Sequence, residues 1–218
     1  MARVHRGERI ALIVKALVER PSEVLSLSVF AERFGAAKST LSEDLAIIRR
    51  GLESADGGSL VTTVGAGGGA RYVPRRSPEE VLKIARSVCD MLSSPDRILP
   101  GGFLYMTDII ASPVLSWEIG EVFATQFADA GAEYVVTMET GGIPVALMTA
   151  RAMNLPLVVC RRDGGAAEGP SVSINYVSGS TRALQNMSLP KRALREGSRA
   201  LVIDDFMKGG GTAIPLAV

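Results

Sequence analysis

Apolar side chains near the start of the chain recur every three or four residues, the spacing of one face of a helix. The pattern runs through Gly7–Glu19 and stops at Pro21, so we predict a first helix there. Ser28 can cap a short second helix over Ser28–Arg33, and Gly35 permits a tight turn after it.

The predicted third helix, from about Lys38 to Leu52, carries a single apolar stripe. Gly51 stands inside this stripe, so we expect the helix to fray near its end. The stripe positions are spaced i, i+4, i+7 and i+11, and we assign them to the core: Leu41, Leu45, Ile48 and Leu52.

A glycine-rich hairpin follows the helices. Leu60–Val64 is rich in β-branched residues, Gly65–Gly69 supplies a tip, and Arg71–Val73 returns as a second strand. Three helices followed by a hairpin are typical of a winged helix-turn-helix module, which we place at residues 1–74. The run Pro74–Pro78 predicts a linker to a second domain, residues 79–218.

Strand and helix signals alternate in the second domain. Short β-branched runs separated by helices predict an α/β fold with a parallel sheet covered on both faces. The predicted helices are Glu79–Leu92, Pro113–Ala130 and Ile143–Met153, and the predicted strands are Phe103–Ile110, Tyr134–Met138, Leu157–Cys160 and Ala200–Asp204.

Composition narrows the class of protein. Of the 218 residues, 47% are hydrophobic. A helix that spans a bilayer needs an apolar run of about 18 residues, and the sequence contains no run of this length. The start of the chain shows no export signal, and the two cysteines, Cys89 and Cys160, fit reduced thiols in a cytoplasm. A single histidine and two isolated cysteines do not assemble the usual zinc site, which excludes most metallohydrolases.

Charge is distributed unevenly along the chain. Residues 1–76 contain 12 Lys and Arg against 8 Asp and Glu, and the remainder contains 12 against 15. A basic front suits contact with a polyanion such as DNA, although an excess of this size also arises by chance.

The strongest local motif follows the predicted strand Ala200–Asp204. Two carboxylates, Asp204 and Asp205, stand where ligands of open α/β sheets bind, and they suit the vicinal hydroxyls of a ribose. The glycine-rich loop after them offers backbone N–H groups that can converge on a phosphate. A glycine-rich turn after a strand is common by itself, but two like charges at one strand end are costly unless they are used.

This motif resembles the phosphoribosyl pyrophosphate (PRPP) loop of the type I phosphoribosyltransferases. Two further stretches strengthen the resemblance. Glu139–Ala146 follows a predicted strand at the place where that family has its pyrophosphate-binding turn, and Ser171–Ser180 is similar to its mobile hairpin.

The wider set of motifs also includes Ser42–Leu45, Ile98–Gly102, Tyr105–Asp108 and Asp204–Lys208. Together these stretches resemble the bacterial purine operon repressors over almost the whole chain, about residues 6–212. The resemblance implies a winged-helix domain fused to a type I phosphoribosyltransferase-like domain, acting in the cytoplasm as a homodimeric repressor of purine biosynthesis genes. It implies operator DNA and PRPP as partners, release of DNA by PRPP, and loss of transferase activity. It implies no cofactor, leaves open whether Mg²⁺ accompanies PRPP, and involves no membrane.

Carried onto this chain, the resemblance assigns effector-binding roles. Asp204 and Asp205 would bind the ribose hydroxyls, and Tyr105 and Lys208 would add polar contacts to PRPP. Lys208 stands where transferases more usually have a small hydroxyl residue, which favours holding PRPP over turning it over. The pyrophosphate turn would be Thr140, Gly141 and Gly142, and the 5′-phosphate cradle would be Met207, Lys208, Gly209, Gly210, Gly211 and Thr212.

The start of the third helix suits a recognition helix in the major groove, because short polar donors and a cation gather there. Arg49 and Arg50, later on that helix, suit phosphates, and Arg71 on the hairpin suits the backbone or the minor groove. For each residue a solvated surface charge is the alternative. The predicted DNA contacts are Lys38, Ser39, Thr40, Ser42, Arg49, Arg50 and Arg71.

The chain departs from the family after Thr212, where a further helix and strands would follow, so we expect the second domain to be truncated and incomplete. Arg161 and Arg162 contact an anion or the DNA-facing surface, or they form a salt-bridged surface pair. Two other functions stay open. One is a purine phosphoribosyltransferase with a regulatory DNA-binding domain, and the other is a DNA-binding protein whose second domain serves only dimerisation.

Overall fold

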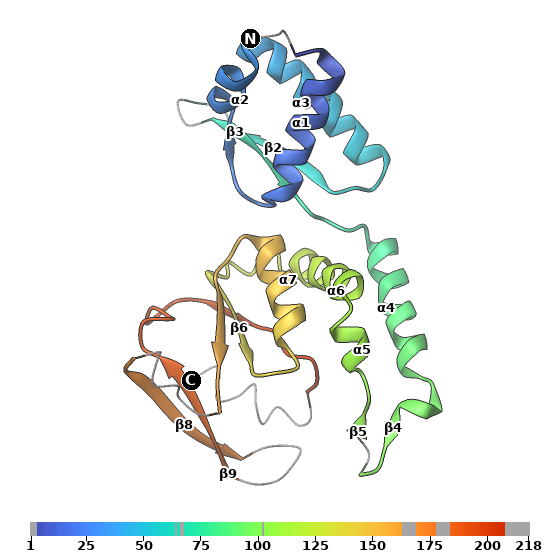
Figure 1. Cartoon of the computed structure of the whole chain (residues 1–218), viewed down its shortest axis with the longest axis vertical. Helices are drawn as coiled ribbons and strands as arrows, with labels where there is room; N and C mark the ends of the chain where they lie inside the picture. Colours follow the sequence, from blue (N-terminus) through green and yellow to red (C-terminus); the bar gives the residue numbers. More distant parts are fainter. Residues whose placement is uncertain are drawn as a thin grey trace. The chain divides into compact units, whose positions relative to one another are not determined.

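The computed structural model describes residues 4–63, 65, 68–101, 103–162, 169–177 and 184–207, which divide into two units. The first comprises residues 4–81 with 152–154, and the second comprises residues 82–151 with 155–207. Figure 1 shows that the first unit is mainly helical, whereas the second combines strands and helices. Each unit is described by itself.

Three helices and a three-stranded sheet form the first unit. β3 lies between β1 and β2 and is antiparallel to both. The three predicted helices and the hairpin are confirmed, in the order of a winged helix-turn-helix. The elements are α1 (Arg6–Glu19), β1 (Leu25–Ser26), α2 (Leu27–Phe34), α3 (Lys38–Ser54), β2 (Ser59–Thr63) and β3 (Gly69–Val73).

Two local details of the first unit differ from prediction. Ser26, not Ser28, caps α2, because its hydroxyl accepts a hydrogen bond from the Ser28 backbone N–H at 3.2 Å. The capping residue is the extended one before the helix, whose side chain turns back to the free N–H groups. α3 does not fray at Gly51 but continues to Ser54, whose hydroxyl donates to the Gly51 carbonyl.

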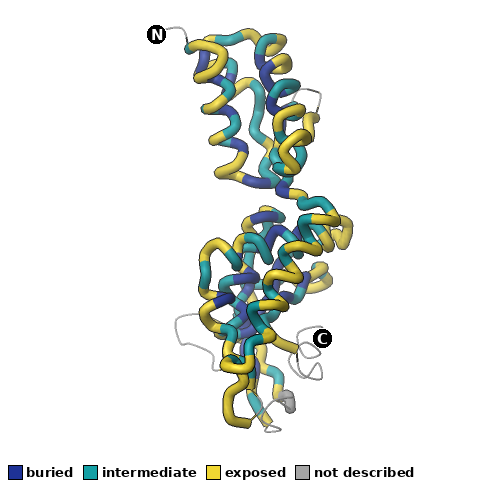
Figure 2. The backbone as a smooth tube through the Cα atoms, turned by 90° about the vertical axis from the view of Figure 1, so that its right-hand side faces the viewer, coloured by how far each residue is buried: buried dark blue, intermediate teal, exposed yellow. Residues whose placement is uncertain are grey.

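The core of the first unit is apolar except for one buried ion pair. Asp44 of α3 is fully buried, and its Oδ2 lies 2.6 Å from Nε of Arg9 on α1. Its other oxygen accepts from Nε of Arg6 at 3.2 Å. Figure 2 shows buried and exposed positions alternating along these helices. The ion pair therefore fixes α1 on α3 inside a core built from Ile13, Leu17, Phe30, Phe34, Leu41, Leu45, Ile48, Leu60 and Ala70.

A parallel sheet forms the centre of the second unit. β6 (Tyr134–Met138) pairs in parallel with β7 (Leu157–Cys160) on one side and with β10 (Ala200–Val202) on the other. Helix α7 (Ile143–Met153) connects β6 to β7, because parallel neighbours need a crossover. The predicted α/β arrangement is confirmed. β6, β7 and α7 have the predicted bounds, while β10 ends two residues earlier than predicted.

The remaining elements lie outside this three-stranded sheet. α6 approaches α7 closely, since a Cβ added at Gly120 would lie 2.6 Å from Cβ of Met148. No helix within the described ranges is long and apolar enough to cross a bilayer. The elements are α4 (Pro78–Leu92), η1 (Pro95–Arg97), β4 (Ile98–Leu99), β5 (Phe103–Leu104), α5 (Thr107–Ile110), α6 (Pro113–Gln126), β8 (Ser171–Val177) and β9 (Leu184–Pro190).

The predicted strand Phe103–Ile110 is wrong in its second half. Only Phe103–Leu104 is a strand, and Thr107–Ile110 is the helix α5. Arg97 donates to both carboxylate oxygens of Asp108, at 2.7 and 2.8 Å, and this bidentate pair holds the chain in its turn. A short apolar run does not distinguish a strand from a buried helix, so periodicity alone could not decide this segment.

We predict that Asp44→Ala destabilises the first unit by about 3 kcal/mol, because it leaves the buried Arg9 guanidinium without its partner. Denaturation followed by far-ultraviolet circular dichroism measures this loss. Fluorescence of Trp117, the only tryptophan of the chain, reports the second unit and serves as the internal reference.

Glu43→Ala is the matched control, because the Glu43 side chain is 70% exposed and lies 3.5 Å from Arg6. Its effect should stay within about 0.5 kcal/mol. Equal effects of the two substitutions would contradict the role given to Asp44.

Candidate functional site

Two stretches that are distant in the sequence meet at the carboxyl edge of the parallel sheet. The backbone N–H of Ile203 donates to the Val136 carbonyl at 2.9 Å, which extends the β10–β6 pairing beyond the last residue of β10. The next two residues are the acidic pair, Asp204 and Asp205. The turn after β6 is the glycine turn, Thr140, Gly141 and Gly142.

The glycine turn lies directly against the acidic pair. A Cβ at Gly141 would lie 2.2 Å from Oδ2 of Asp205. A Cβ at Gly142 would lie 2.5 Å from Oγ1 of Thr137 and 2.9 Å from Oδ1 of Asp204. Real Cβ atoms do not approach oxygen so closely, so only glycine fits these two positions without movement of the backbone or the carboxylates.

The two carboxylates of the acidic pair are close together and partly buried, and this shifts the pKa of Asp204. Burial, together with the side-chain hydrogen bond and the charge of Asp205, raises the pKa of Asp204 from 3.8 to about 6. The Asp205 backbone N–H donates to Oδ1 of Asp204 at 3.0 Å and partly offsets this rise. Two adjacent half-buried carboxylates of this kind are suited to accept hydrogen bonds from a ligand that carries hydroxyl donors.

Glu139, directly before the glycine turn, ties that turn to the end of β7. Its Oε1 accepts from the Arg162 backbone N–H at 2.8 Å, and its Oε2 lies 3.7 Å from an Nη of Arg161. Of the two alternatives for Arg161, the salt bridge is the one that the structure contains. The sequence assigned no role to Glu139, although a carboxylate at the end of a buried strand is a signal of the kind that drew attention to Asp204.

The hairpin that follows β7 is attached to the parallel sheet through its second strand. β8 and β9 are antiparallel, from Ser171 opposite Pro190 to Val177 opposite Leu184. Arg161 exchanges two backbone hydrogen bonds with Ser188 of β9, at 2.9 and 2.7 Å. The tip of the predicted mobile hairpin, residues 178–180, lies outside the described residues.

Tyr105 lies in a separate segment, between β5 and α5, which Figure 1 draws apart from β6. Its side chain is exposed, its carbonyl accepts from Arg97 at 3.0 Å, and the Arg97 guanidinium stacks over its ring at 6.0 Å. The structure therefore does not bring Tyr105 together with the acidic pair.

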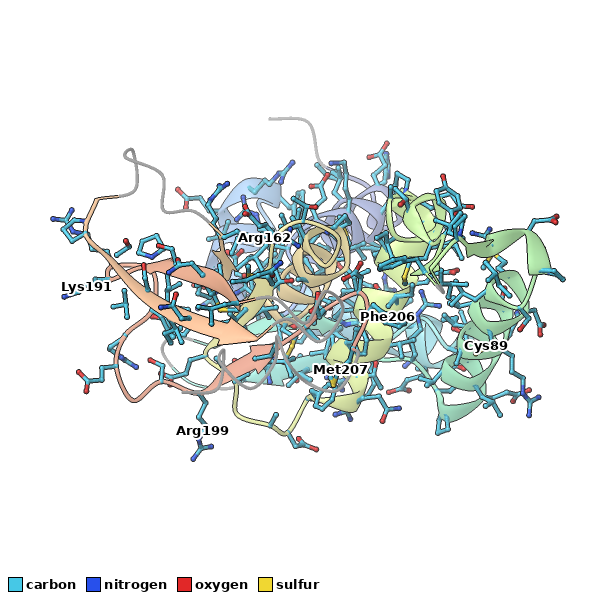
Figure 3. All side chains as sticks on the ribbon, turned by 90° about the horizontal axis from the view of Figure 1, so that it is seen from below. Cys89, Arg162, Lys191, Arg199, Phe206 and Met207 are labelled. Atoms are coloured by element: carbon cyan, nitrogen blue, oxygen red, sulfur yellow. The ribbon has the colours of Figure 1, made fainter. Side chains whose placement is uncertain are left out.

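The start of the predicted phosphate loop points into solvent. Phe206 and Met207 are 56% and 69% exposed, and Figure 3 labels both. The other predicted cradle residues, Lys208, Gly209, Gly210, Gly211 and Thr212, lie outside the described residues. Within the described ranges no three His, Cys, Asp or Glu side chains gather to hold a metal ion.

The predicted recognition helix, α3, has no side-chain cap at its N-terminus. Gly35 closes α2 at a φ of +59°, and its N–H donates to the Ala31 carbonyl. α3 then starts after Ala37, which offers no side-chain cap, so the first N–H groups of this helix stay available. Of the predicted contacts at this end, Lys38, Ser39 and Ser42 are exposed and Thr40 is half-buried.

The three predicted arginine contacts differ in their surroundings. Arg49 donates through Nε to the Leu60 carbonyl at 3.2 Å and through Nη2 to Oγ1 of Thr62 at 2.9 Å. Arg50 and Arg71 are exposed. Arg49 is thus engaged with the wing, the β2–β3 hairpin, whereas its neighbour on α3 faces solvent.

Two family models match the chain. Residues 5–74 match the model described as bacterial purine repressor, N-terminal, and residues 117–214 match the model described as phosphoribosyl transferase domain. The second match spans both the glycine turn and the acidic pair.

Known proteins align with most of the length of this chain. A purine biosynthesis transcriptional repressor of Bacillus subtilis is 43% identical over 95% of this chain and 73% of its own length. A purine biosynthesis transcriptional activator of Lactococcus lactis is 37% identical over 95% of this chain and 76% of its own. An adenine phosphoribosyltransferase structure from Saccharomyces cerevisiae, 19% identical, covers 62% of this chain and 79% of its own at a TM-score of 0.52, a likeness of fold.

We predict that Gly142→Ala destabilises the second unit by about 2 kcal/mol, because the new methyl group would overlap Thr137 and Asp204. Denaturation followed by Trp117 fluorescence measures it. Gly51→Ala is the control, since nothing lies within 4 Å of a Cβ at that exposed helical position. That control should stabilise α3 by about 0.5–1 kcal/mol, measured by far-ultraviolet circular dichroism because Gly51 lies in the first unit, and it should leave the Trp117 transition of the second unit unchanged. A neutral Gly142→Ala would contradict the close approach.

We predict that Asp204→Asn is more stable than the wild type at pH 8. The folded pKa of Asp204 is raised to about 6, so its ionisation costs stability as the pH rises through that value. Because the wild-type carboxyl is protonated in both states below about pH 4, the difference should close there. Thermal unfolding at both pH values checks this. The exposed Asp129→Asn makes the same substitution elsewhere in the unit as a control. A pH-independent difference would argue against the strained pair.

Proposed function

This chain belongs to the family of bacterial purine biosynthesis regulators, in which a purine repressor N-terminal domain precedes a phosphoribosyl transferase domain. From that premise we propose that it binds operator DNA of purine biosynthesis genes in the cytoplasm. PRPP binding to the second unit then releases the DNA. The protein acts as a homodimer and catalyses no transfer. The observation that carries this proposal is the contact of the glycine turn with the acidic pair.

The effector half of the proposal follows from the chemistry of that contact. The carboxylates of the acidic pair accept hydrogen bonds from the vicinal ribose hydroxyls, which offsets the cost of holding two charges together. The glycine turn offers backbone N–H groups to the pyrophosphate, because no side chain blocks the approach. PRPP carries both chemical features, hydroxyls and a diphosphate. Mg²⁺ would enter as a companion of the diphosphate, held largely by the ligand and by water.

The DNA half rests on the open start of α3. Exposed Lys38 and Ser39 stand beside helical N–H groups that have no cap, a combination that favours anionic and hydrogen-bonding partners. In a winged helix-turn-helix this end enters the major groove. Arg50, later on the helix, and Arg71, on the wing, are exposed, which favours contacts with DNA phosphates.

Repression is the proposed direction of regulation. The Bacillus relative, named a repressor, shares more identity with this chain than the Lactococcus relative, which is named an activator. Both directions of regulation need DNA binding.

A purine phosphoribosyltransferase is the second candidate, because residues 117–214 match a phosphoribosyl transferase domain. We expect no pyrophosphate release from PRPP with hypoxanthine, guanine, xanthine or adenine. Turnover with any of these bases would favour the enzyme.

The decisive test is a mobility shift with DNA from the control region of purine biosynthesis genes, with and without PRPP. The wild type should bind this DNA in preference to a shuffled fragment and should release it as PRPP is added. The double variant Asp204→Asn, Asp205→Asn should bind the same DNA but need at least about 100-fold more PRPP for release, because two charged hydrogen-bond acceptors are lost.

Asp129→Asn is the control for this test and should respond to PRPP as the wild type does. A complex that persists at saturating PRPP, or a double variant released as readily as the wild type, would contradict the proposal.

A further inference from the structure

The wing has little side-chain anchorage along its outer strand. In the order β1–β3–β2, β2 is an edge strand that pairs only with β3. Leu60 is 5% exposed and packs in the core, but Val61, Thr62 and Thr63 after it are exposed. The outer half of β2 is therefore held by its pairing with β3 and by whatever reaches it from α3.

Arg49 of α3 reaches this strand. Its Nε and Nη2 donate to the Leu60 carbonyl and the Thr62 hydroxyl, which lie two residues apart on the same strand. The planar guanidinium presents donors in a fixed fork, so two acceptors at this spacing fix both the distance and the orientation of β2 against α3. A lysine at this position keeps the charge but lacks the fork.

The neighbouring Arg50 provides a contrast. It is exposed, and its side chain forms no hydrogen bond or ion pair with the described residues. Two adjacent arginines on one helix thus have different surroundings. One is committed to the wing, and the other is available to an external anion.

We propose that Arg49 is a positioning residue for DNA binding: it clamps the wing to the recognition helix, and it acts on operator affinity through that geometry, not through contact with a phosphate. The inference rests on the proposed function. Its physical basis is that a recognition helix and a wing reach DNA together only if their separation is set before binding. A preorganised surface loses less freedom on association.

The test compares Arg49→Ala, Arg49→Lys and Arg50→Ala, by operator affinity at several salt concentrations and by affinity for shuffled DNA. A phosphate contact contributes about 0.9 to the slope of log K against log salt. Arg49→Ala should therefore weaken operator binding about tenfold while leaving this slope and the affinity for shuffled DNA unchanged. Arg49→Lys should behave like Arg49→Ala, because lysine supplies the charge without the clamp.

Thr62→Val provides a variant that changes no charge. It removes one acceptor of the clamp from an exposed strand position, where valine is well tolerated. It should weaken operator binding in part, and its effect should not add to that of Arg49→Ala, because both break the same contact. In the free protein, amide exchange at residues 61–63 should rise in both Arg49 variants, with an unchanged thermal midpoint.

Each alternative outcome is distinct. A reduced salt slope in Arg49→Ala, together with wild-type affinity in Arg49→Lys, would overturn the clamp and leave the proposed function standing. Unchanged amide exchange over residues 61–63 would overturn the clamp without reference to DNA. A wild type that does not prefer the operator would overturn the proposed function and this inference together.

Discussion

The close approach of the glycine turn to the acidic pair is the constraint on which the candidate effector site depends. The parallel pairing of β10 with β6 brings Asp204 and Asp205 to the same sheet edge as Gly141 and Gly142. The fit leaves no room for a Cβ, and it partly buries carboxylates that repel each other. This arrangement costs stability, and under the proposed function a hydroxyl-bearing ligand would offset that cost.

The first unit depends on a different kind of constraint. Asp44 is buried between α1 and α3, and one oxygen forms a close ion pair with Arg9. Farther along α3, Arg49 joins the same helix to β2. α3 is therefore connected by polar contacts to the helix on one side and to the wing on the other. Such a helix keeps a defined position inside its module, as a recognition element requires.

The misassigned positions have a common physical cause. Phe103–Ile110 has the composition of a strand, but its second half is the helix α5, whose Asp108 pairs with Arg97. Ser28 and Ser26 are equally good capping residues by type, and only the backbone conformation selects Ser26. Arg49 and Arg50 are adjacent residues of the same type, and only the position of β2 gives Arg49 hydrogen-bond partners that Arg50 lacks. In each case the deciding partner is distant in the chain or set by backbone geometry.

The sequence by itself determined the kinds of element and the chemistry available to them. Apolar periodicity and β-branched runs are local properties, so the three helices before the hairpin, β6, α7 and β7 were predictable from it. The acidic and glycine-rich motifs were readable for the same reason. Only the tertiary structure decided which motifs meet. The register of β10 on β6, the burial of Asp44 and the engagement of Arg49 come from contacts between distant segments, whose geometry no local pattern encodes.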